Sequence, residues 1–252
     1  MKTFIKTIHD KANITAYLHD ESPELANATV RPAVLVFPGG GYFMCSDRET
    51  EPIAFAYLAE GYNVFVCRYT VGTDTSFEVA LVDAKTALQM LHENANEWKI
   101  DKEKIVTVGF SAGGHLVSAL GTMSEVKPAA MIIGYPVILS SLGELLQREI
   151  PSTSDYVDEQ TPPTFLFTTR DDVITPVEHT LAFANALDKA GVPFELHVFR
   201  QGEHGLSLGK PHTSNGIKGY VNPAVSQWFS MSVEWIKETI GDFSTTGEFP
   251  KN

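Results

Sequence analysis

Short apolar runs rich in β-branched residues alternate with helical patterns along most of the chain. The runs that predict strands lie at 33–37, 63–69, 104–109, 129–135, 164–169 and 194–199. Apolar residues at helical spacing predict helices at 53–60, 77–92, 112–123, 177–190 and 226–240. Strands that are continuously apolar are typical of parallel sheets covered on both faces. The alternation therefore predicts an α/β fold, with a mostly parallel sheet and helices on both faces.

The remaining segments are less regular. The first 30 residues predict additional antiparallel edge strands, and the stretch 140–161 is expected to cap or border a site. The glycine-rich stretch 205–222 is expected to form a mobile loop. No repeat, charge block or linker divides the chain, so we expect one domain over 1–252 with a loose tail at 241–252.

Composition excludes several classes of protein. The net charge of −12 argues against a nucleic-acid partner or an anionic membrane surface, because phosphates are bound by concentrated Lys and Arg. The chain has no apolar run of membrane-spanning length, and its first residues do not resemble a signal peptide, so a cytoplasmic location is expected. Cys45 and Cys67 form neither a metal cluster nor a disulfide framework and are expected to be buried and free.

The strongest local signal is the string Gly109-Phe-Ser111-Ala-Gly113. It follows the predicted strand 104–109 directly and opens the predicted helix 112–123. This strand–turn–helix setting is typical of a nucleophile elbow, in which a tight turn holds the serine hydroxyl at the carboxyl end of a sheet. The alternative is a glycine-rich turn with an incidental serine.

A serine hydroxyl needs a base, and the base needs an acid that orients it. His204 follows the last predicted strand, so it lies at the same edge of the sheet as Ser111. Asp171 and Asp172 both follow the strand 164–169. We favour Asp172 as the acid, because it stands in a D-x-x-x-P arrangement ending at Pro176, and Asp171 can instead brace the turn.

Two other histidines are less informative. His115 lies one turn inside the helix after Ser111, where packing or hydrogen bonding below the site is expected. His212 lies in the glycine-rich loop, and its role stays open.

Acyl transfer also requires hydrogen-bond donors for the oxyanion. Three consecutive glycines, 39–41, follow the strand 33–37 and leave their N–H groups unobstructed. The N–H of Ala112, at the start of a helix, would supply another donor with favourable polarity. A flexible turn or a phosphate-binding loop are the alternatives, but neither G-x-x-x-x-G-K-[ST] nor G-x-G-x-x-G follows this strand.

Together these segments resemble the α/β-hydrolase esterases. The chain order of serine, aspartate and histidine is also the order stated for that fold. Within the family the chain is most similar to small bacterial acetyl-xylan or feruloyl esterases, which overlap the hormone-sensitive-lipase-like group. The matching segments are Pro38-Gly-Gly-Gly41, Gly109-x-Ser111-x-Gly113-Gly114-His115, Asp171-Asp172…Pro176 and Gly202-x-His204-Gly205, and the similarity extends from about 31 to 240.

The resemblance implies a role for each matching residue. It implies that Ser111 is the nucleophile, His204 the base and Asp172 the orienting acid. It further implies that the N–H groups of Gly40, Gly41 and Ala112 bind the oxyanion, and that no metal or organic cofactor is required.

The chain departs from the hormone-sensitive-lipase-like pattern in two ways. Pro38 stands where those members usually have histidine, which favours the acetyl-esterase side. The segment 135–164 is short, which predicts a reduced lid and an open site.

The expected reaction is hydrolysis of a small-molecule ester through an acyl-enzyme. The resemblance favours short acyl groups, such as acetyl on sugars or oligosaccharides. An edge strand or the C-terminal helix could form a homodimer. Aromatic residues near the motifs are candidate pocket walls, namely Tyr42, Phe43, Tyr135 and Trp228.

Two other functions are possible. A peptidase of the prolyl-oligopeptidase type shares the elbow and the triad, but such enzymes usually carry a further domain, for which 252 residues leave no room. A non-catalytic binding protein of the same fold is the other, and a complete triad argues against it.

Overall fold

The computed structural model describes residues 1–245 and 247, and it contains one eight-stranded sheet. The strand order is β1-β2-β4-β3-β5-β6-β7-β8. The strands are β1 Lys2–His9, β2 Ala12–Leu18, β3 Arg31–Phe37, β4 Asn63–Arg68, β5 Ile100–Phe110, β6 Ala130–Gly134, β7 Thr164–Thr169 and β8 Phe194–Phe199. Strands β3 to β8 pair in parallel, whereas β2 is antiparallel to both β1 and β4.

Helices connect the parallel strands. The α-helices are α1 Glu51–Ala59, α2 Phe77–Glu93, α3 Ala112–Met123, α4 Gly143–Leu146, α5 Val177–Ala190 and α6 Gln227–Ile240. The 3-10 helices are η1 Pro23–Ala28, η2 Asp47–Glu49, η3 Ser140–Leu142, η4 Thr153–Tyr156, η5 Pro211–Thr213 and η6 Lys218–Tyr220. The predicted strands and helices are all present, and the antiparallel edge strands are confirmed. The largest shift is in β5, which begins at Ile100 rather than at 104.

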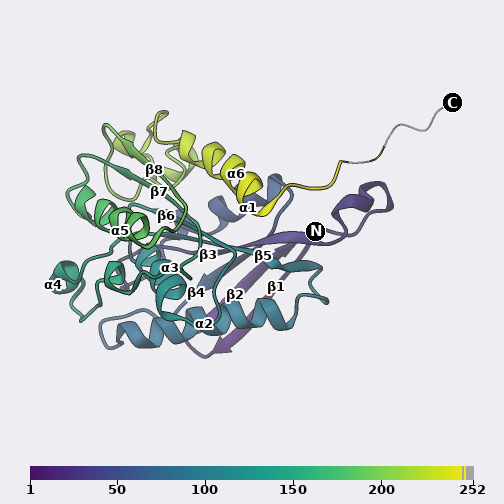
Figure 1. Cartoon of the computed structure of the whole chain (residues 1–252), viewed down its shortest axis with the longest axis horizontal. Coiled ribbons are helices and arrows are strands. Elements are labelled where there is room, and N and C mark those ends of the chain that lie inside the picture. Colours follow the sequence, from purple (N-terminus) through teal and green to yellow (C-terminus); the bar gives the residue numbers. More distant parts are fainter. Residues whose placement is uncertain (246, 248–252) are drawn as a thin grey trace.

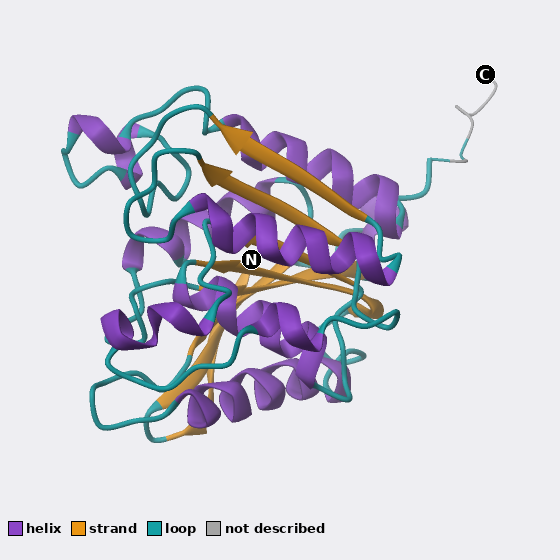
Figure 2. Cartoon of the chain, turned by 60° about the vertical axis from the view of Figure 1, so that its left-hand side comes forward, coloured by secondary structure: helices purple, strands orange, loops and turns teal. Residues whose placement is uncertain are grey.

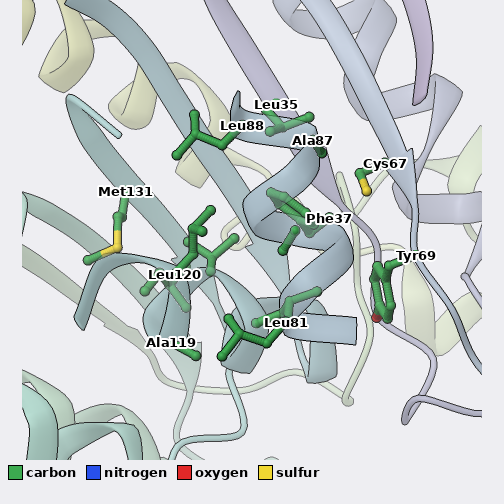
Figure 3. Close-up of a cluster of buried hydrophobic side chains, with 14 of the residues drawn as sticks. Leu35, Phe37, Cys67, Tyr69, Leu81, Ala87, Leu88, Ala119, Leu120 and Met131 are labelled. Carbon is green, nitrogen blue, oxygen red and sulfur yellow. The ribbon is translucent and has the colours of Figure 1, made fainter. Parts of the chain in front are cut away.

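Helices cover both faces of the sheet and create two apolar layers (Figures 1 and 2). Side chains of α2, α3 and α5 pack on one face, and those of α1 and α6 pack on the other. Figure 3 shows part of the first layer, where Leu81 and Leu88 of α2 lie near Leu35 and Phe37 of β3. Fully burying one such side chain is worth about 1.5–3 kcal/mol, so the layers hold the strand ends in fixed positions.

The two cysteines, both expected to be buried, differ in their exposure. Cys67 is buried in the first layer, whereas Cys45 is partly exposed.

In the tail, the Phe243 ring lies 5.7 Å from the Arg31 guanidinium, and Asn27 donates to the carbonyl of Ser244 at 2.9 Å. This part of the predicted loose tail is therefore held against the body of the protein, and residues 246 and 248–252 lie outside the described residues.

The connections matter most at the carboxyl ends of the parallel strands. Loops after β3, β5, β6, β7 and β8 begin at 38, 111, 135, 170 and 200, all at one edge of the sheet. Between β6 and β7 the chain forms only the short elements η3, α4 and η4, in keeping with a reduced lid. No helix within 1–245 combines the length and the apolar character needed to cross a bilayer.

Candidate active site

Ser111 occupies the tight turn between β5 and α3. Its backbone has φ 52° and ψ −118°, a conformation that residues other than glycine rarely adopt. The flanking glycines are required by space, since a Cβ on Gly109 would lie 2.3 Å from the Gly113 carbonyl oxygen. A Cβ on Gly113 would lie 2.2 Å from the carbonyl oxygen of Phe37. The turn therefore depends on close approach of β3, β5 and α3, as the elbow motif predicts.

His204 joins Ser111 to Asp172. The Nε2 atom of His204 lies 2.9 Å from Ser111 Oγ, and its Nδ1 atom lies 2.7 Å from Asp172 Oδ2. Because a carboxylate oxygen only accepts, Nδ1 carries the imidazole proton, and Nε2 is left free to accept the proton of the serine hydroxyl. The structure thus brings together the three residues that the sequence placed at separate strand ends.

The carboxyl group of Asp172 is buried and fully hydrogen bonded. Its Oδ1 accepts from the N–H groups of Ile174 and Thr175, each at 2.9 Å, and the Thr175 hydroxyl lies 3.0 Å from Oδ2. Burial by itself would raise the pKa of Asp172, but the hydrogen bonds from His204 and the backbone outweigh it and lower the pKa below its ordinary value. Asp172 is therefore held as a carboxylate facing His204.

Asp171 is not part of this group. Its Oδ1 accepts from the N–H of Gly202 at 2.8 Å, and its side chain is exposed. This contact ties the loop after β7 to the loop after β8, which matches the bracing role considered for it. His212 lies in η5, exposed and outside the pocket described below.

The carbonyl groups of Gly39 and Gly40, in the glycine loop after β3, accept hydrogen bonds within that loop. Ser46 N–H donates to Gly39 O at 2.9 Å, and Phe43 N–H donates to Gly40 O at 3.0 Å. Since a trans peptide points its C=O and N–H in opposite directions, the N–H groups of Gly40 and Gly41 point away from these loop contacts. Hydrogen bonds within the described residues use neither N–H. Both glycines line the pocket that contains Ser111.

A pocket of about 420 Å³ opens beside Ser111 and His204. Most of its wall is apolar and comes from Phe43, Met44, Val137, Leu142, Leu145 and Leu146. The three leucines belong to η3 and α4, so the stretch expected to border a site does border this pocket. Arg48 lies on the wall near His204, where its Nη1 donates to Gly205 O at 2.8 Å and its guanidinium stacks 4.5 Å from the Tyr220 ring.

Of the four aromatic residues expected at the pocket wall, only Phe43 lies there. Tyr42 and Tyr135 have φ values of 62° and 35°, and both side chains are buried away from the pocket. Trp228 lies on the face of α6 that packs against the sheet, stacked 4.4 Å from Phe167. The expectation for these three is corrected: they form the structure behind the site.

Tyr42 has a clear partner below the site. Its hydroxyl donates to Nδ1 of His115 at 2.8 Å, while Nε2 of His115 donates to Pro151 O at 2.9 Å. Burial lowers the pKa of His115 to about 4, so the ring is neutral at pH 7. His115 therefore has the hydrogen-bonding role expected of it, and it joins the glycine loop to the segment before η4.

Three polar residues at the site escaped the sequence analysis: Arg48, Glu49 and Thr175. Thr175 lies beside the predicted acid, and its hydroxyl is 3.1 Å from His204 Nδ1. Glu49 is almost fully buried although it belongs to a short run of charged residues that reads as a helix start. The one available signal was their position in the loops that follow β3 and β7.

In the described part of the chain, no group of three His, Cys, Asp or Glu residues could hold a metal ion.

Comparison with known families gives two matches. Residues 21–131 match the BD-FAE family, and residues 78–220, more than half of the chain, match the prolyl oligopeptidase family. Both matches include Ser111, and the second also includes Asp172 and His204.

Curated relatives are longer proteins. Endo-1,4-beta-xylanase B of Butyrivibrio fibrisolvens is 34% identical over 82% of this chain, and the chain spans 36% of that protein. An acetylxylan esterase of Xylanibacter ruminicola is 29% identical over 70% of the chain, which spans 41% of that protein. The chain therefore matches less than half the length of either relative.

Solved structures match over nearly their full length. An α/β hydrolase from a Medee basin deep-sea metagenome library is 42% identical with a TM-score of 0.89, and the alignment covers 94% of this chain and 98% of that one. An acetyl ester-xyloside bifunctional hydrolase from Caldicellulosiruptor lactoaceticus is 33% identical with a TM-score of 0.78, covering 91% and 88%. The sheet order, the serine turn and these likenesses agree, and the chain belongs to the esterases of the α/β-hydrolase family.

Proposed function

We propose that the protein is a serine carboxylesterase that removes short acyl groups, acetyl in particular, from sugars or oligosaccharides. The observation that carries this proposal is the pair of contacts made by His204, to Ser111 Oγ at 2.9 Å and to Asp172 Oδ2 at 2.7 Å, inside a pocket. A nucleophile, a base and an orienting acid at hydrogen-bond distance are the parts that acyl transfer needs.

The reaction has two steps. In the first, Ser111 Oγ attacks the ester carbonyl while His204 Nε2 takes the hydroxyl proton, and Asp172 stabilises the imidazolium. The tetrahedral intermediate collapses, the bond to the alcohol breaks, and the alcohol leaves with the proton from Nε2. In the second, His204 takes a proton from water, the hydroxide attacks the acyl-enzyme, and the acid leaves as Ser111 regains its proton.

The negative oxygen of each intermediate needs donors. We assign this role to the N–H groups of Gly40, Gly41 and Ala112. The first two point away from the loop contacts, and the third lies at the start of α3, where the helix dipole favours negative charge. In well-studied acyl-transfer enzymes one such donor is worth about 3–4 kcal/mol of transition-state stabilisation.

Two features favour acetylated sugars. Relatives at 29% and 33% identity are described as an acetylxylan esterase and an acetyl ester-xyloside hydrolase. The proton that His204 donates goes to the leaving alcohol, so groups beside His204 face that alcohol. Arg48 lies there, and its guanidinium can donate to sugar hydroxyls.

The test is a substrate panel with a labelling control. Acetylated xylose and xylobiose are compared with nitrophenyl acetate, butyrate and hexanoate, and a fluorophosphonate probe reports reactive serine. We expect labelling at Ser111 and the highest kcat/KM with acetyl esters. A folded protein that neither labels nor hydrolyses any ester would be a non-catalytic binder and would overturn the proposal.

A peptidase is the second candidate, because residues 78–220 match the prolyl oligopeptidase family. Proline-containing peptide amides in the same panel separate the two. Turnover of the amides in the absence of ester turnover would favour the peptidase.

A further inference from the structure

A buried carboxyl group at the wall of the pocket has no part in the reaction described above. Glu49, in η2, is 2% exposed, and two donors converge on it. The N–H of Gly39 donates to Oε2 at 2.8 Å, and the Tyr135 hydroxyl donates to Oε1 at 2.6 Å. Burial of an acid that ordinarily prefers water is costly unless each oxygen is used, as it is here.

One oxygen of Glu49 fixes the glycine loop. Gly39 is confined on both sides, since a Cβ there would lie 2.7 Å from Glu49 Oε2 and 3.1 Å from Ser111 Cβ. Its N–H is bound to Glu49 and its carbonyl accepts from Ser46, so both polar groups of the residue are held by the same loop. These contacts set the orientation of the peptide that presents the Gly40 N–H.

The other oxygen of Glu49 leads to the histidine loop. The Tyr135 hydroxyl accepts from the N–H of Ser207 at 2.9 Å, and the Tyr135 ring packs edge-on against His204, with ring centroids 5.3 Å apart. Tyr135 and Ser207 both have positive φ, at 35° and 52°, a strained backbone that persists only where surrounding contacts fix it. Ser207 is held further, because its carbonyl accepts from Trp228 Nε1 at 2.8 Å.

We propose that Glu49 and Tyr135 are a positioning pair that fixes the glycine loop and the His204 loop relative to Ser111, and that turnover depends on this pair. The inference rests on the proposed esterase function. Neither side chain needs to touch the reacting atoms, because Glu49 acts through the Gly39 peptide and Tyr135 acts through Ser207 and the His204 ring.

The chemistry of the site requires an acid rather than an amide. A carboxylate offers an acceptor at both oxygens, whereas a glutamine has one acceptor end and one donor end. In Glu49→Gln, either Gly39 N–H or the Tyr135 hydroxyl therefore faces an NH₂ group and loses its acceptor, although the volume is unchanged. Tyr135→Phe removes the same link from its other end and also leaves Ser207 N–H without an acceptor.

The experiment is a double-mutant cycle with Glu49→Gln, Tyr135→Phe and the double variant. Turnover of nitrophenyl acetate is measured per active site, counted by fluorophosphonate labelling, so that loss of folded protein does not enter kcat. We expect Glu49→Gln to lower kcat roughly 10- to 100-fold with KM within about threefold, because an oxyanion donor is displaced. Because both residues act as one unit, the double variant falls within about threefold of the poorer single variant.

A matched control is Tyr57→Phe. Tyr57 and Ser232 form a buried hydroxyl pair at 2.8 Å between α1 and α6, and in the described residues neither hydroxyl is hydrogen bonded to Glu49, Tyr135 or a residue of the triad. This variant should lose stability but keep kcat per labelled site.

The outcomes separate the two proposals. If kcat per labelled site stays within threefold in Glu49→Gln, or if the two losses multiply, the positioning pair is refuted while the esterase remains. A wild-type protein with neither turnover nor labelling would refute the esterase and this inference with it.

Discussion

The tautomer of His204 depends on a single oxygen atom of Asp172, so Asp172→Asn is the most informative change in the site. In the wild type, Oδ1 accepts from two backbone N–H groups, and Oδ2 accepts from His204 Nδ1. An asparagine can keep the first two bonds only by placing its oxygen at the Oδ1 position. Its NH₂ group then faces Nδ1, which must become an acceptor, and the imidazole proton moves to Nε2.

The magnitude follows from that proton. A protonated Nε2 lies 2.9 Å from Ser111 Oγ and can no longer take the hydroxyl proton. The same change in a serine protease triad lowers kcat about 10⁴-fold. We expect a loss of about 10³- to 10⁴-fold here, which corresponds to about 4–5.5 kcal/mol of transition-state stabilisation. The opposite orientation of the asparagine amide is unfavourable, because it would put the NH₂ group against two N–H donors.

The assay compares kcat for nitrophenyl acetate in Asp172→Asn and in Asp171→Asn. Asp171 accepts one backbone N–H from Gly202 at the surface, a bond that asparagine can keep through its own oxygen. Asp171→Asn should therefore stay within about threefold of wild type. Thermal unfolding is followed in parallel to confirm that both variants fold. Equal losses in the two variants, or less than a tenfold loss in Asp172→Asn, would refute the reasoning.

Three further predictions concern neighbouring features. Ser111→Ala should abolish ester turnover and fluorophosphonate labelling while its thermal unfolding midpoint stays close to that of wild type; residual turnover above background would contradict the mechanism. The pKa of His115 is about 6.5 in the unfolded chain and about 4 in the folded protein, so protonation below pH 6.5 favours the unfolded chain. The contribution of His115 to the free energy of unfolding therefore falls by about 2 kcal/mol from pH 7 to pH 5. Urea unfolding should show that the free energy of unfolding decreases less between pH 7 and pH 5 in His115→Gln than in wild type. An equal decrease in the two proteins would disprove this. Leu145→Trp fills part of the pocket from an exposed position, so kcat/KM should fall for nitrophenyl hexanoate and not for the acetate; a parallel fall for both esters would count against it.

The parts of the site that could be predicted are those fixed by strand ends. Ser111, Asp172 and His204 lie in the loops that follow the parallel strands β5, β7 and β8, and parallel strands finish at one edge of a sheet. A local motif and a count of strands were therefore enough to place them together. The position of strand ends distinguishes Asp172 from Asp171 only weakly, because both residues follow β7 and differ mainly in where their side chains point.

The parts that could not be predicted depend on backbone conformation inside loops. Tyr42 and Tyr135 were expected to face the pocket, but both rings are buried in the interior, and both residues have a positive φ that no local pattern predicts. Glu49 lies among Asp47, Arg48 and Glu51, and no local pattern distinguishes this buried charge from its less buried neighbours. Its burial depends on Gly39 in its own loop and on Tyr135, which follows β6, so only the assembled sheet shows it.

The backbone of Ser111 also restricts which amino acids can replace its oxygen. Threonine carries the same hydroxyl, but its branched Cβ is poorly tolerated at φ 52°, so an exchange to threonine would distort the turn. Cysteine has an unbranched side chain and meets no such penalty. The turn between β5 and α3 can therefore hold a thiol in place of the hydroxyl without rearrangement, whereas a threonine would require a different backbone there.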